Sequence, residues 1–317
     1  MKKYLLTIAW ALVALTIVNA QNNQERMGKT VRLIYPQWQG GNVSSLITEV
    51  KNPDDASLGY MLGAQLLEVL APQNPAQKKI TIPISTEIGE RKVQDGVYDR
   101  DIIAQQTSVA VEMLKIEKPD RIITLGGECS VSVAPFTFLA DKYKNDVAVV
   151  WIDAHPDITL PGEAYPGYHA MAVTALMGKG DNKILSSLPT SIAPSNILFV
   201  GLRDWERDEI KVRQREYGMK NLTVQEVKVD SKAVLNWIKQ TGAKHILIHF
   251  DMDVLDPSEI IPAVGVVNNG LKMSEVVRII NDIHAHAQID ALTVAEPMPR
   301  IAINLRNMLR AIKMFEE

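Results

Sequence analysis

The chain has 317 residues, of which 46% are hydrophobic and 22% are charged, and its formal net charge at pH 7 is −3. This composition is ordinary for a globular protein and can fill a sizeable core. No repeat or low-complexity segment is visible. No basic patch suited to phosphates appears either, so we do not expect nucleic acid as a partner.

Residues 1–20 have the order of a secretory signal peptide. Lys2 and Lys3 precede the apolar stretch Tyr4–Val18, and the segment Val18–Ala20 offers small residues for cleavage. We therefore predict a signal peptide at 1–20, export to the periplasm or the exterior, and no stable membrane association after cleavage. The alternatives are a buried helix and an uncleaved anchor, although about 15 apolar residues are short for a span of about 20.

After this leader, strand and helix patterns alternate along the chain. Apolar runs rich in β-branched residues predict strands at Val31–Tyr35, Arg121–Leu125, Val147–Ile152, Asn196–Leu202, His245–Phe250 and Ala291–Ala295. Helical periodicity predicts helices at Leu58–Leu70, Asp101–Ile116, Ser130–Leu139, Val227–Gln240, Ser274–Ile283 and Ile301–Phe315. Cap signals lie at Asp230-Ser231 and at Ser274.

The alternation of strands and helices predicts an α/β fold, a parallel sheet with helices on both faces. We expect residues 21–317 to form one domain, with 157–167 as an active-site loop.

Four polar clusters directly follow four of the predicted strands. They are Gly126–Ser130, Asp153–Asp157, Asp251–Asp253 and Glu296-Pro297. In an open α/β sheet, ligands bind just beyond the carboxyl ends of the strands. We therefore expect the four clusters to converge on one crevice.

Two of these clusters alternate charged side chains in the way that a metal site requires. Asp153, His155 and Asp157 can point at one locus, because alternate residues of a strand share a face. Asp251 and Asp253 repeat the pattern. Carboxylates with an imidazole suit a hard or borderline divalent cation, and without one they would repel each other and their pKa values would rise. One such cluster alone is typical of an Asx-rich turn, whereas the whole set predicts a metal site.

Cys129 is the single cysteine, and it lies in the first polar cluster. No disulfide can form within the chain. A lone cysteine in an exported protein is buried and inert, paired with another chain, or chemically used. Composition alone favours a buried, inert thiol, and the position of Cys129 in an acidic cluster weakens that interpretation.

The polar clusters resemble the signatures of the ureohydrolase superfamily, which includes arginases and agmatinases. DAHPD at Asp153–Asp157 and DMDVLDPS at Asp251–Ser258 look like its metal signatures, and GGECS at Gly126–Ser130 looks like an altered GGDHS. Three further blocks are similar to the family: GLRD at Gly201–Asp204, the loop around His169, and EPMP at Glu296–Pro299. The order and spacing of the blocks agree from about Val31 to the C-terminus. The resemblance implies the three-layer arginase-like fold.

The resemblance also implies a cofactor and a mechanism. The family's site holds two Mn²⁺ ions bridged by a hydroxide, which attacks the guanidinium carbon so that urea leaves. One ion would be bound by Cys129 (histidine in the usual pattern), Asp153, Asp157 and Asp251, and the other by His155, Asp153, Asp251 and Asp253. Asp157 would hold the proton of the hydroxide, Glu296 would pair with the guanidinium, and His169 would relay a proton to the departing amine.

Three positions beside the metal signatures depart from the family's pattern. A thiolate at Cys129 is a softer ligand than imidazole, so the first ion could be Zn²⁺, Co²⁺, Ni²⁺ or Fe²⁺ instead of Mn²⁺. Glu128 is one methylene longer than the usual Asp and could shift the groups that orient the ligands. His249 stands where arginases usually have a small hydroxyl residue. It could support the site, pack as a core histidine or act as a ligand.

The substrate-binding positions also differ from those of arginases. Thr159 and Tyr165 match positions where arginases carry Asn and Ser, Glu206 replaces the shorter acidic residue after GLRD, and Glu209 retains an acidic partner. The resemblance therefore implies a small guanidino or amidino substrate without specifying L-arginine. By analogy with the family it also implies a homo-oligomer, a trimer or a hexamer.

We conclude from the sequence that the protein is a metal-dependent hydrolase of a guanidino or amidino C–N bond that releases urea, most simply an exported arginase-like enzyme. The alternatives within the family are agmatinase, guanidinobutyrase and formimidoylglutamase. A non-catalytic member that binds metal or a guanidino ligand is the alternative that Cys129 favours. An amidase of the histone-deacetylase type would share the general fold but would need only one metal.

Overall fold

The computed structural model describes residues 28–44, 46–47 and 49–315. The signal peptide predicted at residues 1–20 lies outside the described residues. Within the described part of the chain, no helix is both long and apolar enough to cross a membrane.

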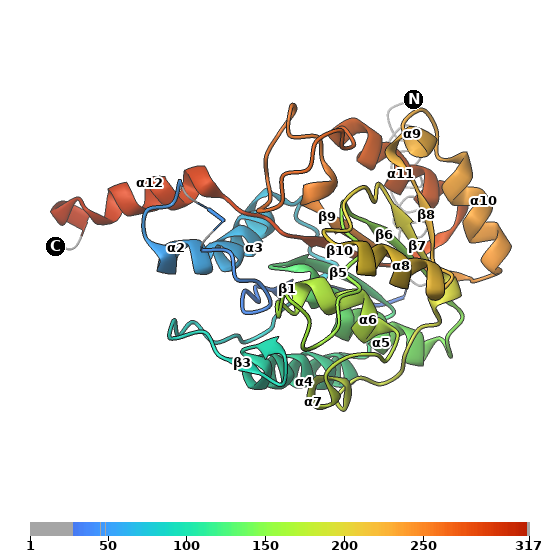
Figure 1. The fold of residues 1–317 in the computed structure, drawn as a ribbon, viewed down its shortest axis with the longest axis horizontal. Coiled ribbons are helices and arrows are strands. Elements are labelled where there is room, and N and C mark those ends of the chain that lie inside the picture. The colour runs from blue at the N-terminus through green and yellow to red at the C-terminus, as the bar shows by residue number, and fades with distance from the viewer. Residues whose placement is uncertain (1–27, 45, 48, 316–317) are drawn as a thin grey trace, which may run out of the picture.

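An eight-stranded sheet, parallel throughout, forms the centre of the molecule (Figure 1). Its strands, in spatial order, are β2 (Lys78–Thr81), β1 (Thr30–Tyr35), β5 (Arg121–Gly126), β10 (Gln288–Ala295), β9 (His245–Asp251), β6 (Val147–Ile152), β7 (Ile197–Val200) and β8 (Lys220–Leu222). The residues of β6, VAVVWI, are all buried. A continuous apolar run of this kind is typical of a strand that is covered on both faces.

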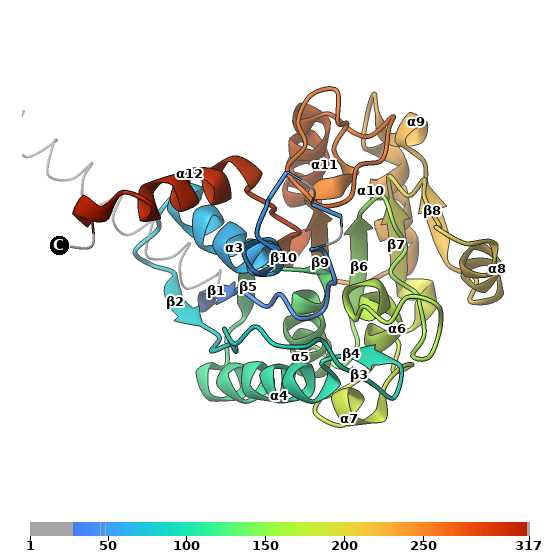
Figure 2. The ribbon, with the colours of Figure 1, turned by 60° about the vertical axis from the view of Figure 1, so that its left-hand side comes forward.

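Helices cover both faces of the sheet and complete three layers (Figure 2). The helices are α2 (Pro53–Ser57), α3 (Gly59–Leu70), α4 (Arg100–Glu117), α5 (Val133–Lys142), α6 (Ala172–Leu176), α7 (Asn182–Leu185), α8 (Asp208–Glu216), α9 (Val224–Val227), α10 (Lys232–Thr241), α11 (Met273–His286) and α12 (Arg300–Arg310). Alternate residues of β6 enter two different cores: Val149 and Trp151 pack with α5, whereas Val150 and Ile152 pack with α10 and α11. The predicted α/β architecture is therefore confirmed.

The predicted strands and most predicted helices are present, with differences at their ends. The helix predicted at Val227–Gln240 is two helices, α9 and α10, because the chain turns at residues 228–231 and Ser231 is the N-cap of the second. The N-cap predicted at Ser274 is wrong: α11 begins one residue earlier, and its cap residue, Lys272, donates its backbone N–H to Glu275 at 2.8 Å. The helix predicted at Ser130–Leu139 begins as a 3-10 turn, Cys129–Ser132, before α5.

Both edge strands, a small hairpin and the helices α2, α6, α7 and α8 were not predicted. Strands β2 and β8 read KKIT and KNL, and most of their residues are exposed or half-buried. Short, charged edge strands protect a sheet from pairing with other chains, and they lack the apolar run by which a buried strand is found. The hairpin pairs β3 (Val93–Gln94) with β4 (Val97–Tyr98) in antiparallel orientation.

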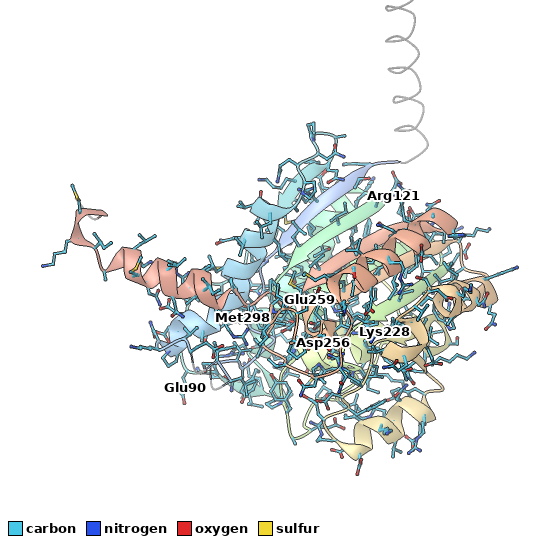
Figure 3. The ribbon with its side chains drawn as sticks, turned by 90° about the horizontal axis from the view of Figure 1, so that it is seen from above. Glu90, Arg121, Lys228, Asp256, Glu259 and Met298 are labelled. Carbon is cyan, nitrogen blue, oxygen red and sulfur yellow. The ribbon has the colours of Figure 1, made fainter. Side chains whose placement is uncertain are left out.

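The strand order explains why the polar clusters meet. Strands β5, β10, β9 and β6 are consecutive neighbours in the middle of the sheet, and each is followed by one of the four clusters. All carboxyl ends lie at one edge because the strands are parallel. In Figure 3, Met298 and Asp256, which follow β10 and β9, lie away from Arg121 at the start of β5.

Candidate metal centre

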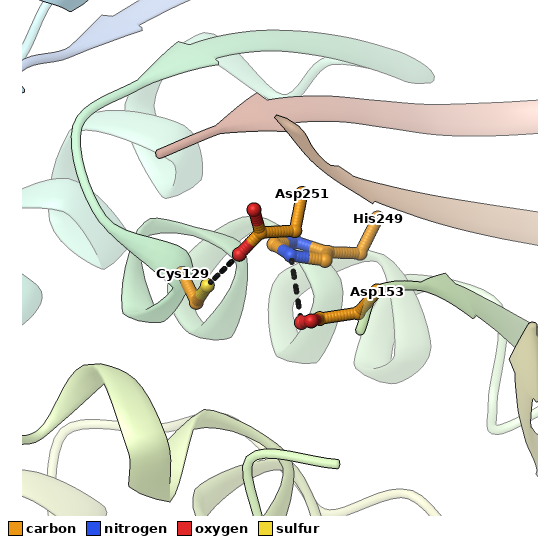
Figure 4. Close-up of side chains that lie close together, drawn as sticks. All are labelled: Cys129, Asp153, His249 and Asp251. Carbon is orange, nitrogen blue, oxygen red and sulfur yellow. Dashed lines mark hydrogen bonds and ion pairs between the residues drawn. The ribbon is translucent and has the colours of Figure 1, made fainter. Parts of the chain in front are cut away.

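Four buried side chains from three strand ends form the first group of potential metal ligands (Figure 4). One ligand atom each of Cys129, Asp153, His249 and Asp251 lies within 4.8 Å of the others. The Cys129 thiol donates to Asp251 Oδ2 at 2.9 Å. The indole Nε1 of Trp151 donates to Asp153 Oδ2 at 2.9 Å and orients that carboxylate.

A second group shares Asp153 with the first and adds His155 and Asp253. The His155 ring places Nδ1 2.8 Å from Asp253 Oδ2. The backbone N–H of His155 donates to Asp153 Oδ1 at 2.6 Å, and the backbone N–H of Asp253 donates to Asp251 Oδ1 at 2.6 Å. Asp153 and Asp251 therefore each have one oxygen held by the backbone of their own turn, and the turn aims the other oxygen.

The structure brings together most of the residues predicted as metal ligands, with two differences in grouping. Asp157 belongs to neither group, and Asp251 groups with Cys129 but not with His155. Asp157 is buried, its backbone is left-handed with φ 49°, and its Oδ2 has no hydrogen-bond partner among the described residues. Left-handed backbone is costly for a residue other than Gly, and one oxygen of the carboxylate that it positions has no donor among the described residues.

The ionisation of these groups suits a cation. Burial raises the pKa of Asp153 to about 7, with the negative charge of Asp253 adding to the shift. Burial also raises the pKa values of Asp251 and Cys129 well above their usual range, and neighbouring carboxylates raise them further. Burial opposes ionisation of Asp253 too, but the adjacent His155 lowers its pKa to about 2. A divalent cation would attract the carboxylates that otherwise repel one another and would favour their ionised forms, so the donor set fits a metal.

A third group lies next to the first and contains Cys129, His169 and Glu296. His169 Nδ1 lies 3.4 Å from Glu296 Oε1, and its Nε2 shares a hydrogen bond of 2.8 Å with the Tyr165 hydroxyl. Burial lowers the pKa of His169, but Tyr165 and Glu296 outweigh burial and raise the pKa well above 6.5. Both neighbours therefore favour the protonated imidazole.

Tyr60 is a site residue that the sequence did not reveal. It lies on α3, is fully buried, and donates its hydroxyl proton to Glu296 Oε2. Burial and the charge of Glu296 raise the pKa of this phenol well above 10. A tyrosine in an amphipathic helix more than 200 residues before its partner carries no local signal of such a contact.

The groups open into a cavity of about 740 Å³. Thr159, Tyr165 and Glu206 line it, as expected for residues that meet a substrate. Glu209 does not line it: α8 begins at Asp208, and the Glu209 carboxylate accepts from Arg207 Nε at 2.8 Å on the exposed side.

Glu128 of the GGECS block and Arg203 of the GLRD block hold loops and do not line the cavity. Glu128 is buried with a pKa that burial raises, and it accepts from Gln37 Nε2 at 2.7 Å and from the Ser130 backbone at 2.7 Å. Arg203 donates to the backbone carbonyls of Asp253 at 3.1 Å and Val267 at 2.7 Å. These bonds fix the turns that carry Cys129 and Asp253.

Known proteins with these features were found by sequence and by structure. Curated arginases from Staphylococcus aureus are 28% identical over 226 residues, which cover 68% of this chain and 73% of theirs. The arginase of Entamoeba histolytica is 27% identical over 80% of this chain and 91% of its own.

Solved structures share the fold. The arginase of Entamoeba histolytica in complex with L-ornithine superposes with a TM-score of 0.68 at 21% identity, over 90% of this chain and 96% of its own. The formimidoylglutamase of Bacillus subtilis superposes with a TM-score of 0.60 at 16% identity, over 90% of this chain and 86% of its own. The arginase family matches residues 73–317, which hold every predicted ligand. The chain is a hydrolase of the arginase family.

Proposed function

We propose that this protein is a metal-dependent ureohydrolase, most simply an arginase-like enzyme, that cleaves a guanidino C–N bond and releases urea. The observation that carries the proposal is the placement of two acidic metal-binding groups, sharing Asp153, beside the paired His169 and Glu296. Two divalent cations, when bound, lower the pKa of a water nucleophile and stabilise charge in the transition state.

The ions would be held by the groups described above. Cys129, Asp153 and Asp251 supply the first position, and His155, Asp153 and Asp253 supply the second. Asp157 is predicted to complete the first position, and its Oδ2, which has no partner among the described residues, can receive a ligand or a proton. Mn²⁺ is the expected ion, with Zn²⁺, Co²⁺, Ni²⁺ or Fe²⁺ favoured where the donor is Cys129.

The third group supplies the rest of the chemistry. Glu296 is a buried carboxylate in the wall of the cavity, and the N–H groups of a guanidinium can pair with such a carboxylate. His169 lies against the same carboxylate, which favours the protonated form of the imidazole. It can pass that proton to the amine as the C–N bond breaks, which makes the amine a neutral leaving group.

The tail of the substrate would lie toward the outer part of the cavity. Thr159, Tyr165 and Glu206 line this space together with the apolar Val43 and Val266. Agmatine, guanidinobutyrate, formimidoylglutamate and L-arginine all present a guanidino or amidino head group, with different tails. We propose L-arginine first because the curated relatives given above are arginases.

The test is product release from a panel of these four compounds after the metal-free protein has been loaded with Mn²⁺, Co²⁺, Ni²⁺ or Zn²⁺. We expect urea from a guanidino compound. Glu296→Gln keeps an acceptor for Tyr60 but removes the charge, so it should raise KM at least tenfold while leaving metal content unchanged. Full metal occupancy with no product from any compound would overturn the proposal in favour of a non-catalytic binding protein.

Export and self-association remain part of the proposal. The order of residues 1–20 supports export to the periplasm or the exterior. An exposed apolar stripe on α12, which includes Ile301, Leu305 and Met308, supports a homo-oligomer.

A further inference from the structure

The His249 ring is fixed in position, but one of its nitrogens has no hydrogen-bond partner among the described residues. His249 lies on β9 and is fully buried, and its ring stacks on Trp151 with a centroid separation of 3.6 Å and an interplanar angle of 10°. Nδ1 shares a hydrogen bond of 2.8 Å with Ser132 Oγ. Nε2 is the nitrogen without a partner. Burying such a nitrogen alone costs free energy, so this orientation requires a partner.

The metal position proposed at Cys129, Asp153 and Asp251 lies next to His249 Nε2 and can supply this partner. Nε2 is 3.9 Å from Asp153 Oδ2, too far for a hydrogen bond. Two atoms that bind one cation at about 2.0–2.3 Å each are at most about 4.6 Å apart, so the separation fits two ligands of one ion. Figure 4 shows the ring directed toward Asp153, with the Cys129–Asp251 pair beside it.

We propose that His249 Nε2 is a ligand of the first metal position. The inference rests on the metal centre of the proposed function, but it does not depend on turnover. Strand β9 then supplies an imidazole from the sheet, and Cys129 supplies a thiol from the turn after β5. A set of one sulfur, one nitrogen and two carboxylates suits Zn²⁺ or Co²⁺ better than Mn²⁺.

The Ser132 hydroxyl can accept a hydrogen bond from His249 Nδ1–H, which is the arrangement typical of metal-ligating histidines. Such residues donate their other ring N–H to a fixed acceptor, which selects the tautomer with a free lone pair at the metal. With Nδ1–H donating to Ser132 Oγ, the lone pair of His249 is on Nε2 and faces Asp153.

His245 is a matched control on the same strand. Its ring also stacks on an aromatic residue, Tyr143, at 3.6 Å and 4°. Its Nδ1 lies 2.6 Å from Asp290 Oδ2, at the opposite end of β9 from the cavity. His245 therefore pairs with a carboxylate of the protein, whereas Nε2 of His249 has no partner among the described residues.

The direct test is ¹⁵N NMR of the metal-free protein labelled in its histidines and titrated with Zn²⁺. The Nε2 signal of His249 is assigned by its absence in His249→Phe. We expect that signal to move to the position of a metal-bound imidazole and to saturate with metal content, while the His245 signals stay unchanged. Zn²⁺ bound at full stoichiometry with an unmoved His249 Nε2 signal would overturn the proposal.

Affinity measurements give a second, independent test. His249→Phe keeps the ring stacked on Trp151 but removes both nitrogens, so Co²⁺ affinity at one position should fall more than about 100-fold, beyond the 10–100-fold loss typical of a supporting residue. His245→Phe should bind as the unaltered protein does. Thermal unfolding of the metal-free variants checks that they fold. If His249→Phe does not fold, His249→Ser assigns the His249 signal instead, and the titration of the unaltered protein decides.

A double variant that moves the imidazole from residue 249 to residue 129 gives a third test. His249→Ser should lose the ion at the first position. Adding Cys129→His should raise the metal affinity at least tenfold above that of His249→Ser, because the new histidine supplies an imidazole from the turn after β5. Wild-type affinity in both His249 variants would overturn the inference. Metal binding through His249 without product release would instead overturn the proposed function and leave this inference standing.

Discussion

The surroundings of Asp153 change the pKa of its carboxylate from the ordinary value of an aspartate. Its carboxylate is almost fully buried, accepts from the Trp151 indole and the His155 backbone, and belongs to both metal-binding groups. Two neutral donors cannot balance a buried charge beside Asp253, which is why its pKa rises to about 7. In the proposed metal centre this carboxylate, which is costly to ionise in the metal-free protein, would belong to both metal positions.

This shift predicts how the stability of the metal-free protein depends on pH. The folded state holds the Asp153 proton more tightly than the unfolded chain, because the pKa is about 7 in the fold and 3.8 for an unperturbed aspartate. The contribution of Asp153 to the free energy of unfolding is therefore fully present below about pH 4. It falls by on the order of 4 kcal/mol as the pH rises to about 7. Asp153→Asn should remove that slope.

The measurement is urea unfolding of the metal-free protein and of Asp153→Asn from pH 4 to 7. Burial lowers the pKa of His249 to about 3, which opposes the slope of Asp153, but His249 is present in both proteins and cancels in their difference. The exposed Asp54→Asn is the control and should keep the wild-type slope. Equal slopes for wild type and Asp153→Asn would contradict the assignment.

A second residue-scale prediction concerns Asp253. Asp253→Asn keeps an acceptor for the Ala154 backbone but removes the charge that faces His155. Metal content and activity should fall together, with at least a tenfold loss of affinity at the second position, while the fold is retained. The control is Asp290→Asn, which breaks a similar pair with His245 away from the cavity. Full occupancy with normal turnover in Asp253→Asn would remove Asp253 from the centre.

At the scale of elements, contact between α3 and the segment after β10 positions Glu296, the carboxylate proposed to pair with the guanidinium. Tyr60 of α3 holds Glu296, and about one turn further along the helix Gly63 lies against the backbone of Pro297. A Cβ at Gly63 would lie 2.0 Å from the Pro297 carbonyl oxygen. Glycine is therefore required for the close approach that brings Tyr60 to Glu296.

Gly63→Ala tests this contact. In an unconstrained helix the change would stabilise by about 1 kcal/mol. Here a backbone carbonyl cannot move aside, so overpacking should instead destabilise by about 1–3 kcal/mol and raise KM for the guanidino substrate. Gly89→Ala is the control, because nothing lies within 4 Å of its added Cβ. A more stable Gly63→Ala with unchanged KM would refute the packing argument.

At the scale of the whole molecule, α12 extends from the body and is packed on one side only (Figure 1). Ile303 is buried, and Arg306 and Asn307 each bond to Asp55 at 2.9 Å. On the opposite side Leu305 is 51% exposed and Met308 is 54% exposed. Exposed apolar residues that are arranged on one face of a helix mark an interaction surface.

We predict that this stripe contacts a second copy of the chain. Leu305→Glu with Met308→Glu should lower the molar mass found by light scattering during size-exclusion chromatography, without loss of metal. The exposed Lys239→Glu on α10 serves as the charge-change control. A monomeric wild-type protein would exclude the homo-oligomer.

The signal peptide proposed at residues 1–20 leads to a prediction about the native protein. The mature chain should begin at Gln21, because Val18–Ala20 has the small residues that signal peptidases accept. N-terminal sequencing of the native protein checks this. A soluble cytosolic form that begins at Met1 would contradict export.

Local sequence was sufficient for the strands of the sheet centre and for predicting that most of the candidate ligands lie together. The runs at Val147–Ile152 and His245–Phe250 are apolar and β-branched, so their burial follows from composition, and Asp153 and Asp251 follow them directly. Because parallel strands end at one edge, residues at their ends could be predicted to meet without knowledge of the fold.

Only the tertiary structure decided which strands are neighbours and what lies between them. Strands β5, β6, β9 and β10 follow that order in the chain but lie in the order β5-β10-β9-β6, because crossover helices on both faces determine where each strand joins the sheet. The contact between Tyr60 and Glu296 depends on that order, and so does the position of His249 Nε2, which has no partner among the described residues. Both arise from packing between distant segments, which leaves no periodic or local pattern in the sequence.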